Sequence, residues 1–362
     1  MHIIQLFIYS SFIIYIMSFN TKRGQILNNI YLQQLFLIIF ILISLTITII
    51  SGIDYLDKAI YTSHFFDAKF YNLKQFLEIY NDNFLFYLLT YAIAQIFSNP
   101  NLYYTLLHLL FIYFLLRGIY LIFHKNLYLT VLCLFLYLNF VFYYSHTLNI
   151  LKQGLSISII IYAIGKMVSS KKYLISLIIA PLIHWASFFF SILVFISKRI
   201  KNLNTLSMII IYSFFSTLFL TNTSSYFSNI INFILPDNAY PYLALERLDY
   251  YGGAYKIQFW LFNTFNFILF LSPLIFKKLF VQDKLKNYRL FFQYFTINSS
   301  IFFVFGFIPF SDRIAAYSWM LIPILLTLFI DSIKIPNYFK FLILIIIIIM
   351  GYITTPLDGR FF

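Results

Sequence analysis

The chain has few charged residues. They make up 10% of its 362 residues, whereas soluble domains carry roughly 25%. Hydrophobic residues make up 62% of the chain, and the mean hydropathy is +0.85. This composition excludes an ordinary soluble domain and indicates a polytopic membrane protein. Backbone polar groups inside a bilayer must be bonded within their own segment, so we expect the long apolar runs to be helices.

The chain also lacks the usual signatures of metal and phosphate chemistry. Its single cysteine, Cys133, can form no intrachain disulfide and no cysteine metal cluster. There is no glycine-rich phosphate loop, no CxxC motif and no HExxH motif. We therefore expect no metal site and no cofactor. The net charge of +13 is explained by membrane topology and anionic lipid headgroups, so we expect no nucleic-acid partner.

Ten runs are candidates for membrane-spanning helices, which need roughly 17–25 apolar residues. They are residues 2–19, 31–51, 101–123, 127–145, 152–168, 205–221, 257–276, 290–310, 314–330 and 339–354. The short stretch 84–97 predicts a re-entrant or interfacial segment, and 173–196, with Pro181 near its centre, predicts a broken helix. We expect an all-α fold, a polytopic inner-membrane bundle of about 10–12 transmembrane helices. Residues 1–362 would form a single integral membrane domain.

The distribution of lysine and arginine sets the expected orientation, because cytoplasmic loops collect these residues. We place the N-terminus outside and let both irregular segments return to the side from which they start. The inside then carries a net charge of +15 and the outside −2. If both segments crossed fully, Lys171 and Lys172 would lie outside instead. The favoured orientation places the two largest loops, 52–83 and 222–256, outside.

Most of the unusual polar residues then face the outside. The first outer loop holds Asp54 and Glu78, either of which can act as a general base or orient a hydroxyl group. Asp54, with Tyr55 beside it, directly follows a span, where a low dielectric constant would raise the pKa of its carboxyl group. The competing interpretation is a solvated acidic loop.

Asn149, Lys152, Gln153 and Ser156 are spaced at i, i+3, i+4 and i+7, so we expect them to share one helix face. A lysine with an Asn and a Gln beside it, at the outer end of a span, suits a phosphate or sugar site. The competing interpretation is a lysine whose ammonium group extends to the lipid headgroups.

Two further residues lie at breaks between apolar helices. His184 suits proton transfer or phosphate chemistry, but it equally suits a hydrogen bond to a carbonyl group that Pro181 leaves free. Arg313, with Tyr317 one helical turn later, suits a planar clamp on a diphosphate. A local pair between Arg313 and Asp312 is the alternative.

The second outer loop adds Arg247, Tyr250 and Tyr251 ahead of a glycine pair. These side chains can shape a concave polar surface. A simple ion pair of Arg247 with Glu246 or Asp249 is the alternative.

In their order and spacing these residues resemble the EpsG-like, Wzy-type polymerases of bacterial O-antigens, capsules and exopolysaccharides. The residues that carry the resemblance are Gly52-x-Asp54-Tyr55, Glu78, Asn149-x-x-Lys152-Gln153, Ala180 to Ser187 with His184, Arg247 with Tyr250 and Tyr251, and Arg313-x-x-x-Tyr317. The family usually has arginine where this chain has Lys152, so Lys152 would supply a point charge in place of a bidentate contact. An arginine commonly precedes the Gly-x-Asp as well, and none does here.

The resemblance implies a multi-spanning glycosyltransferase of the GT-C kind that acts at the periplasmic face. Such an enzyme moves the growing glycan from undecaprenyl diphosphate to a hydroxyl group of the next undecaprenyl-diphosphate-linked repeat unit. Lys152, Arg313 and Arg247 would hold the diphosphate, Asp54, Glu78 or His184 would take the proton, and Tyr55, Tyr250, Tyr251, Asn149, Gln153 and Tyr317 would complete the substrate site. A flippase and a chain-length regulator in the same membrane are the implied protein partners.

Three other functions compete with this one. A repeat-unit flippase would need charges deep in several helices, whereas here the polar groups gather at one face. A polysaccharide ligase uses the same chemistry with another acceptor. A membrane O-acyltransferase would need a second acid or Asn paired with His184 on a path reached from the cytoplasm.

Overall fold

The computed structural model describes residues 30–50, 57–197, 203–223, 257–306 and 311–354. Within these ranges all regular secondary structure is helical, apart from one isolated β-bridge between Phe280 and Ile333. The all-α fold class is therefore confirmed. The expected span 2–19 and nearly all of the expected loop 222–256 lie outside the described residues.

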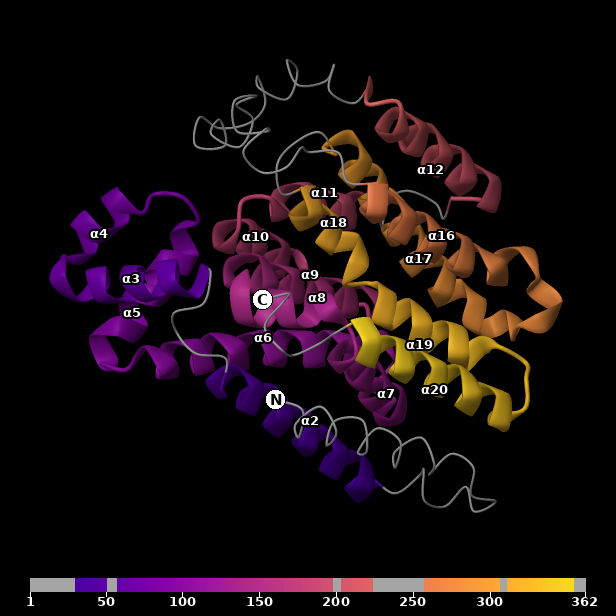
Figure 1. Cartoon of the computed structure of the whole chain (residues 1–362), viewed down its shortest axis with the longest axis horizontal. Coiled ribbons are helices and arrows are strands. Elements are labelled where there is room, and N and C mark those ends of the chain that lie inside the picture. The colour runs from indigo at the N-terminus through magenta and orange to yellow at the C-terminus, as the bar shows by residue number, and fades with distance from the viewer. Residues whose placement is uncertain (1–29, 51–56, 198–202, 224–256, 307–310, 355–362) are drawn as a thin grey trace. The chain divides into compact units, whose positions relative to one another are not determined.

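The chain divides into two compact units, and the first comprises Met1–Ile192 with Ile335–Phe362. Its described helices are α2 (Ile30–Ile50), α3 (Asp57–Phe70), α4 (Leu73–Ile79), α5 (Phe84–Ile96), α6 (Pro100–Ile122), α7 (Leu127–Leu138), α8 (Val141–Tyr144), the π-helix η1 (Ser145–Asn149), α9 (Leu151–Val168), α10 (Leu174–Ile183) and α20 (Asn337–Thr354). Helix α11 (Ser187–Ser197) runs on into the second unit. Helix α9 packs along α6 and α10, and α3, α4 and α5 lie together near one end of α6 (Figure 1).

The second unit comprises Leu193–Lys334. Its described helices are α12 (Thr205–Leu220), α16 (Ile257–Ile275), the 3-10 turns η4 (Lys277–Leu279) and η5 (Gln282–Lys284), α17 (Leu285–Val304), α18 (Ser311–Trp319) and α19 (Ile322–Ser332). Helix α17 contacts α12, α16, α18 and α19, and most of its residues are buried. It is therefore the central helix of this unit. The expectation of one membrane domain over the whole chain stays a prediction.

Five segments of the described chain are long and apolar enough to cross a membrane, or six if one bent pair counts as a span. They are Ile30–Ile50, Pro100–Ile122, Leu151–Val168, Ile257–Ile275 and Ser311–Ser332. Shorter apolar helices accompany them, among them α5, α10, α11 and α12. The polytopic character is thus confirmed, while the count of about 10–12 spans stays a prediction.

Both irregular segments expected from the sequence are short or broken in the structure. Helix α5 has 13 residues, a length of about 20 Å at 1.5 Å per residue, against a hydrocarbon core of about 30 Å. The segment after Lys172 forms α10 and α11, separated at His184, whose backbone is extended. Pro181 inside α10 cannot donate a helix hydrogen bond, which favours a break nearby.

The expected span 127–145 is not one straight helix, which corrects the prediction. Helix α7 ends at Leu138, and the segment Val141–Asn149 turns away from it by 83°. The side-chain amide of Asn139 donates to the carbonyl oxygen of Phe135, and the Tyr144 hydroxyl donates to that of Leu138. These bonds occupy carbonyl groups that the end of a helix leaves free, so they stabilise the bend.

Helices α6 and α9 approach each other at two glycines. A Cβ atom on Gly165 would lie 2.4 Å from the carbonyl oxygen of Gly118, and one on Gly118 would lie 2.8 Å from the backbone nitrogen of Tyr162. Because these neighbours are backbone atoms, they cannot move aside as a flexible side chain can. The glycines let the two helices pack closely, as small residues do between membrane helices.

We expect Gly165→Ala to destabilise the protein by about 1–3 kcal/mol, because the added methyl group overpacks the α6–α9 contact. The measurement is thermal unfolding of the purified protein in detergent. Ala92→Val is the control, since it adds carbon atoms at an exposed position of α5. Equal melting temperatures for Gly165→Ala and the control would contradict the close packing.

Candidate functional site

Lys152 lies in the first turn of α9 and is largely withdrawn from solvent. Its side chain is 17% exposed. The ammonium nitrogen Nζ donates to the Tyr87 hydroxyl at 3.0 Å and lies 3.7 Å from Oδ2 of Asp82. An opposite charge and a hydroxyl acceptor thus offset part of the cost of moving the ammonium group out of water.

Aromatic rings enclose the same ammonium group. Nζ lies 4.9 Å from the ring centroid of Tyr87, 5.8 Å from that of Phe86 and 5.9 Å from that of Tyr61. A cation within about 6 Å of a ring face is attracted by the ring quadrupole. Lys152 is therefore positioned by α3 and α5, two helices distant from it in sequence.

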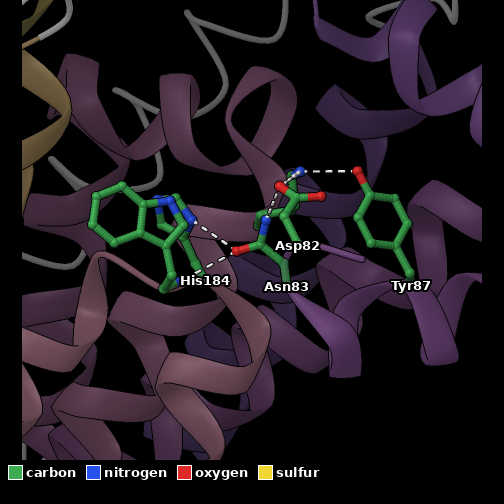
Figure 2. Close-up of polar contacts among 6 residues, drawn as sticks. Asp82, Asn83, Tyr87 and His184 are labelled. Atoms are coloured by element: carbon green, nitrogen blue, oxygen red, sulfur yellow. Dashed lines mark hydrogen bonds and ion pairs between the residues drawn. The ribbon is translucent and has the colours of Figure 1, made fainter. Parts of the chain in front are cut away.

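Asn83 connects this lysine to the broken helix. Its Oδ1 accepts a hydrogen bond from the backbone N–H of Trp185 at 3.0 Å and lies 3.4 Å from Nδ1 of His184. Its amide nitrogen donates to Oδ2 of Asp82, the same oxygen that faces Lys152. Figure 2 shows Asp82 and Asn83 between Tyr87 on one side and His184 on the other.

The backbone of Asn83 makes this bridge possible. The residue is buried and has φ 58° and ψ 51°, the left-handed conformation that Asn tolerates better than most residues. It directly precedes α5, so the turn and the helix start coincide. The break between α10 and α11 is thereby held at the end of α9 that carries Lys152.

His64 lies on α3, with its ring 4.4 Å from that of Tyr80 and 5.5 Å from that of Tyr87. Burial of the ring and then the positive charge of Lys152 lower the pKa of His64 to about 4, against smaller raising effects from Asp67 and Asp82. The imidazole is therefore neutral at pH 7.

Together these residues form what we call the Lys152 cluster. It comprises Tyr61, His64, Tyr80, Asp82, Asn83, Phe86, Tyr87, Lys152 and His184. The cluster brings an ammonium group, a carboxylate, two imidazoles and several phenol rings to one end of the first unit. Such groups can bind an anion, contact a sugar and transfer a proton.

The expected regular helical spacing of Asn149, Lys152, Gln153 and Ser156 is interrupted after Asn149, which corrects that part of the prediction. Asn149 ends the π-helix η1, and α9 begins only at Leu151, because the backbone of Ile150 is not helical. Oδ1 of Asn149 accepts the backbone N–H of Asp57 at 2.9 Å. Gln153 and Ser156 are buried within the unit. Lys152 belongs to the cluster through its contacts with Asp82 and Tyr87.

Five of the other expected site residues fall outside the described residues: Asp54, Tyr55, Arg247, Tyr250 and Tyr251. Glu78 is exposed on α4, 3.9 Å from the Lys74 ammonium group. Arg313 and Tyr317 lie on α18 in the second unit. The roles expected for all of these residues stay predictions.

A second buried polar network links α2, α3, α6 and α8. His108 contacts the hydroxyl oxygens of Ser44 and Thr48, each at 2.6 Å, and Ser44 also bonds the Tyr143 hydroxyl. Nζ of Lys58 donates to the carbonyl oxygen of Thr48 at 3.4 Å. Burial lowers the pKa of Lys58 to about 8. Because these groups bond one another, we interpret the network as a support for the start of α3.

Seven of the nine members of the Lys152 cluster were not named as site residues from the sequence: Tyr61, His64, Tyr80, Asp82, Asn83, Phe86 and Tyr87. The signal for two of them was the polar run Asn81-Asp82-Asn83 directly before an apolar stretch too short to span. No local pattern distinguishes His64 or Tyr87. Among the described residues there is also no group of three His, Cys, Asp or Glu side chains that could hold a metal ion.

Comparison with known protein families identifies a match over most of the chain. The family model described as the EpsG family matches residues 33–358, which is most of the chain and includes both the Lys152 cluster and Arg313. No curated protein and no solved structure matches the chain.

We expect Asn83→Gly to loosen the break between α10 and α11. Glycine keeps the left-handed backbone but leaves the Trp185 N–H without its side-chain acceptor, and an unmet buried donor costs about 1–3 kcal/mol. Hydrogen–deuterium exchange should then be faster at residues 184–186. Asn81→Gly is the control, because Asn81 is exposed. Unchanged exchange in Asn83→Gly would show that the bond does not hold the break.

We expect Lys152→Met to raise the pKa of His64 above its value of about 4, because a nearby positive charge disfavours the imidazolium form. Carbon NMR of labelled histidine side chains at varied pH measures it, with the His64 signal assigned by its loss in His64→Gln. Lys166→Met, at the other end of α9, should leave the pKa unchanged. The same titration in both lysine variants would refute the coupling.

Proposed function

The chain belongs to the EpsG family, and on this basis we propose that it polymerises lipid-linked oligosaccharide repeat units at the periplasmic face of the bacterial inner membrane. Family membership points to a membrane polysaccharide polymerase, an enzyme of the glycosyltransferase type. The finer proposal is that the growing glycan moves from undecaprenyl diphosphate to a hydroxyl group of the next undecaprenyl-diphosphate-linked unit.

The observation that best supports the finer proposal is the position of Lys152. Its ammonium group lies at the start of an apolar helix, beside Asp82 and the Tyr87 hydroxyl. In the proposed reaction the anomeric C–O bond breaks and its electron pair leaves with the diphosphate. A preorganised cation stabilises this developing negative charge more in the transition state than in the ground state.

To bind a diphosphate, the ammonium group of Lys152 must first separate from the carboxylate of Asp82. Its side chain is 41% exposed, and Oδ2 also accepts from the Asn83 amide. A diphosphate carries more negative charge than a carboxylate, so it can displace Asp82 from the ammonium group. Asp82 then retains its hydrogen bond to Asn83, and the break between α10 and α11 stays in place.

A proton must leave the acceptor hydroxyl group as the new glycosidic bond forms. His184 is one candidate, because its Nδ1 faces the acceptor atom Oδ1 of Asn83. That contact favours a proton on Nδ1 and leaves Nε2 as the basic atom. Asp54 and Glu78 stay as alternative bases, and Arg313 and Arg247 as further diphosphate ligands. The proposed protein partners are a flippase, which delivers the substrate, and a chain-length regulator.

We expect deletion of the gene to leave surface polysaccharide with single repeat units and no ladder on a gel, and the wild-type gene to restore the ladder. Lys152→Ala should restore it about 100-fold less well, since a lost electrostatic group costs about 10²–10³ in rate. Arg313→Ala should fail in the same way.

Lys166→Ala is the matched control, because Lys166 lies on the same helix in its last turn, and it should restore the full ladder. Protein levels in the membrane are compared by immunoblot. Complete loss of surface sugar on deletion would favour a flippase, and an unchanged ladder would refute the proposed function. A normal ladder with Lys152→Ala would refute the role of that lysine alone.

A further inference from the structure

His64 lies in the Lys152 cluster, and neither the motifs nor the proposed function uses it. It is on α3, in the segment expected to lie outside the membrane. Its ring packs against Tyr80, Tyr87 and Tyr61, with centroids 4.4, 5.5 and 6.2 Å away. The side chain is half-buried, so part of the ring remains open to a ligand.

The nitrogens of His64 differ in their surroundings. Nδ1 is buried and has no hydrogen-bond partner among the described residues. Because Nδ1 is enclosed, Nε2 is the nitrogen that an incoming hydroxyl group can reach. The imidazole is thus held by ring packing and keeps its hydrogen-bonding capacity for a ligand.

Burial, and then the positive charge of Lys152, keep this imidazole neutral by lowering its pKa. Lys152 of α9 faces it with a positive charge, and Asp67 of α3 and Asp82 face it with negative charges. Tyr80, at the end of α4, is a neutral neighbour, because burial and then its hydrogen bond to Asp67 raise the pKa of its hydroxyl group. A neutral imidazole can accept a proton, whereas an imidazolium ion cannot.

We propose that His64 is a further catalytic residue and takes the proton from the sugar hydroxyl group that attacks the donor. This inference rests on the proposed function. The acceptor O–H bond breaks and its proton passes to Nε2 of His64, while the acceptor oxygen bonds the anomeric carbon. The anomeric C–O bond breaks, its electron pair leaves with the diphosphate, and the proton later passes to water.

Tyr80 suits the acceptor sugar, because its ring is half-buried and lies 4.4 Å from the imidazole. Tyr87 is buried and stacks against Tyr80, with the two ring centroids 5.0 Å apart at 23°. Aromatic faces pack against the apolar face of a sugar ring while its hydroxyl groups keep polar partners. An acceptor held there would direct a hydroxyl group at His64, close to the cation that holds the leaving group.

Donor binding would also activate the base. A diphosphate bound at Lys152 offsets the positive charge that lowers the pKa of His64, so that pKa rises in the donor complex. Because a base works best when its pKa lies near the working pH, the imidazole becomes a stronger base once the donor is in place. Deprotonation of the acceptor is then favoured when a leaving group is present.

The test uses the purified full chain in lipid nanodiscs with undecaprenyl-diphosphate-linked repeat units. We expect His64→Gln to lower kcat about 10²–10⁴-fold, the usual contribution of general base catalysis, with a smaller change in KM. In the wild type, the acidic limb of kcat should lie at higher pH than the acidic limb of kcat/KM for the donor. The first reports the pKa of His64 in the donor complex, and the second reports its pKa in the free enzyme. His64→Gln should lose this limb from kcat.

His124→Gln is the matched control, since His124 is exposed in the turn between α6 and α7, and it should keep the wild-type rate. Thermal unfolding of each variant checks the fold. If His64→Gln does not fold, the acidic limbs of the wild type provide the test, and acidic limbs of kcat and kcat/KM at the same pH would contradict the proposal. An unchanged rate and pH profile in His64→Gln would overturn the role of His64 and leave the polymerase intact. A wild-type protein that forms no polymer would overturn the proposed function instead.

Discussion

The packing at one end of the first unit depends on the ammonium group of Lys152, which lies at the start of the apolar helix α9. Lys152 is enclosed by Tyr61, Phe86 and Tyr87 and faces Asp82. A charge removed from water is costly unless partners offset the loss. The start of α9 must therefore be covered by α3, α5 and the connection before α5. The packing at this end follows from that requirement.

The same connection supports a second costly feature, the break between α10 and α11. Backbone groups freed by a helix break need partners where water is scarce. Asn83 accepts the Trp185 N–H and donates to Asp82, so the break and the cation share one support. The cation and the break are thus linked through one left-handed residue, Asn83.

Part of this arrangement was predictable from the sequence. Apolar run length predicted most of the described helices, and the short run before Asn99 and the proline before His184 predicted the irregular ones. The bend after Leu138 was not predicted, because no Gly or Pro marks it and side-chain bonds to carbonyl groups stabilise it. Lys152 and His184 were identified as candidate site residues because polar side chains at membrane depth are costly and commonly functional.

The sequence by itself determined the helical class, the membrane character and the family resemblance, because these follow from composition, run length and motif order. Only the tertiary structure decided which side chains meet Lys152. Tyr87 and Asp82 precede it by 65 and 70 positions, and no periodicity relates residues so far apart. It also decided that the helical register is interrupted between Asn149 and Lys152, because Asn149 ends a π-helix and the backbone of Ile150 is not helical. Packing between helices therefore sets the site, whereas local pattern sets the helices.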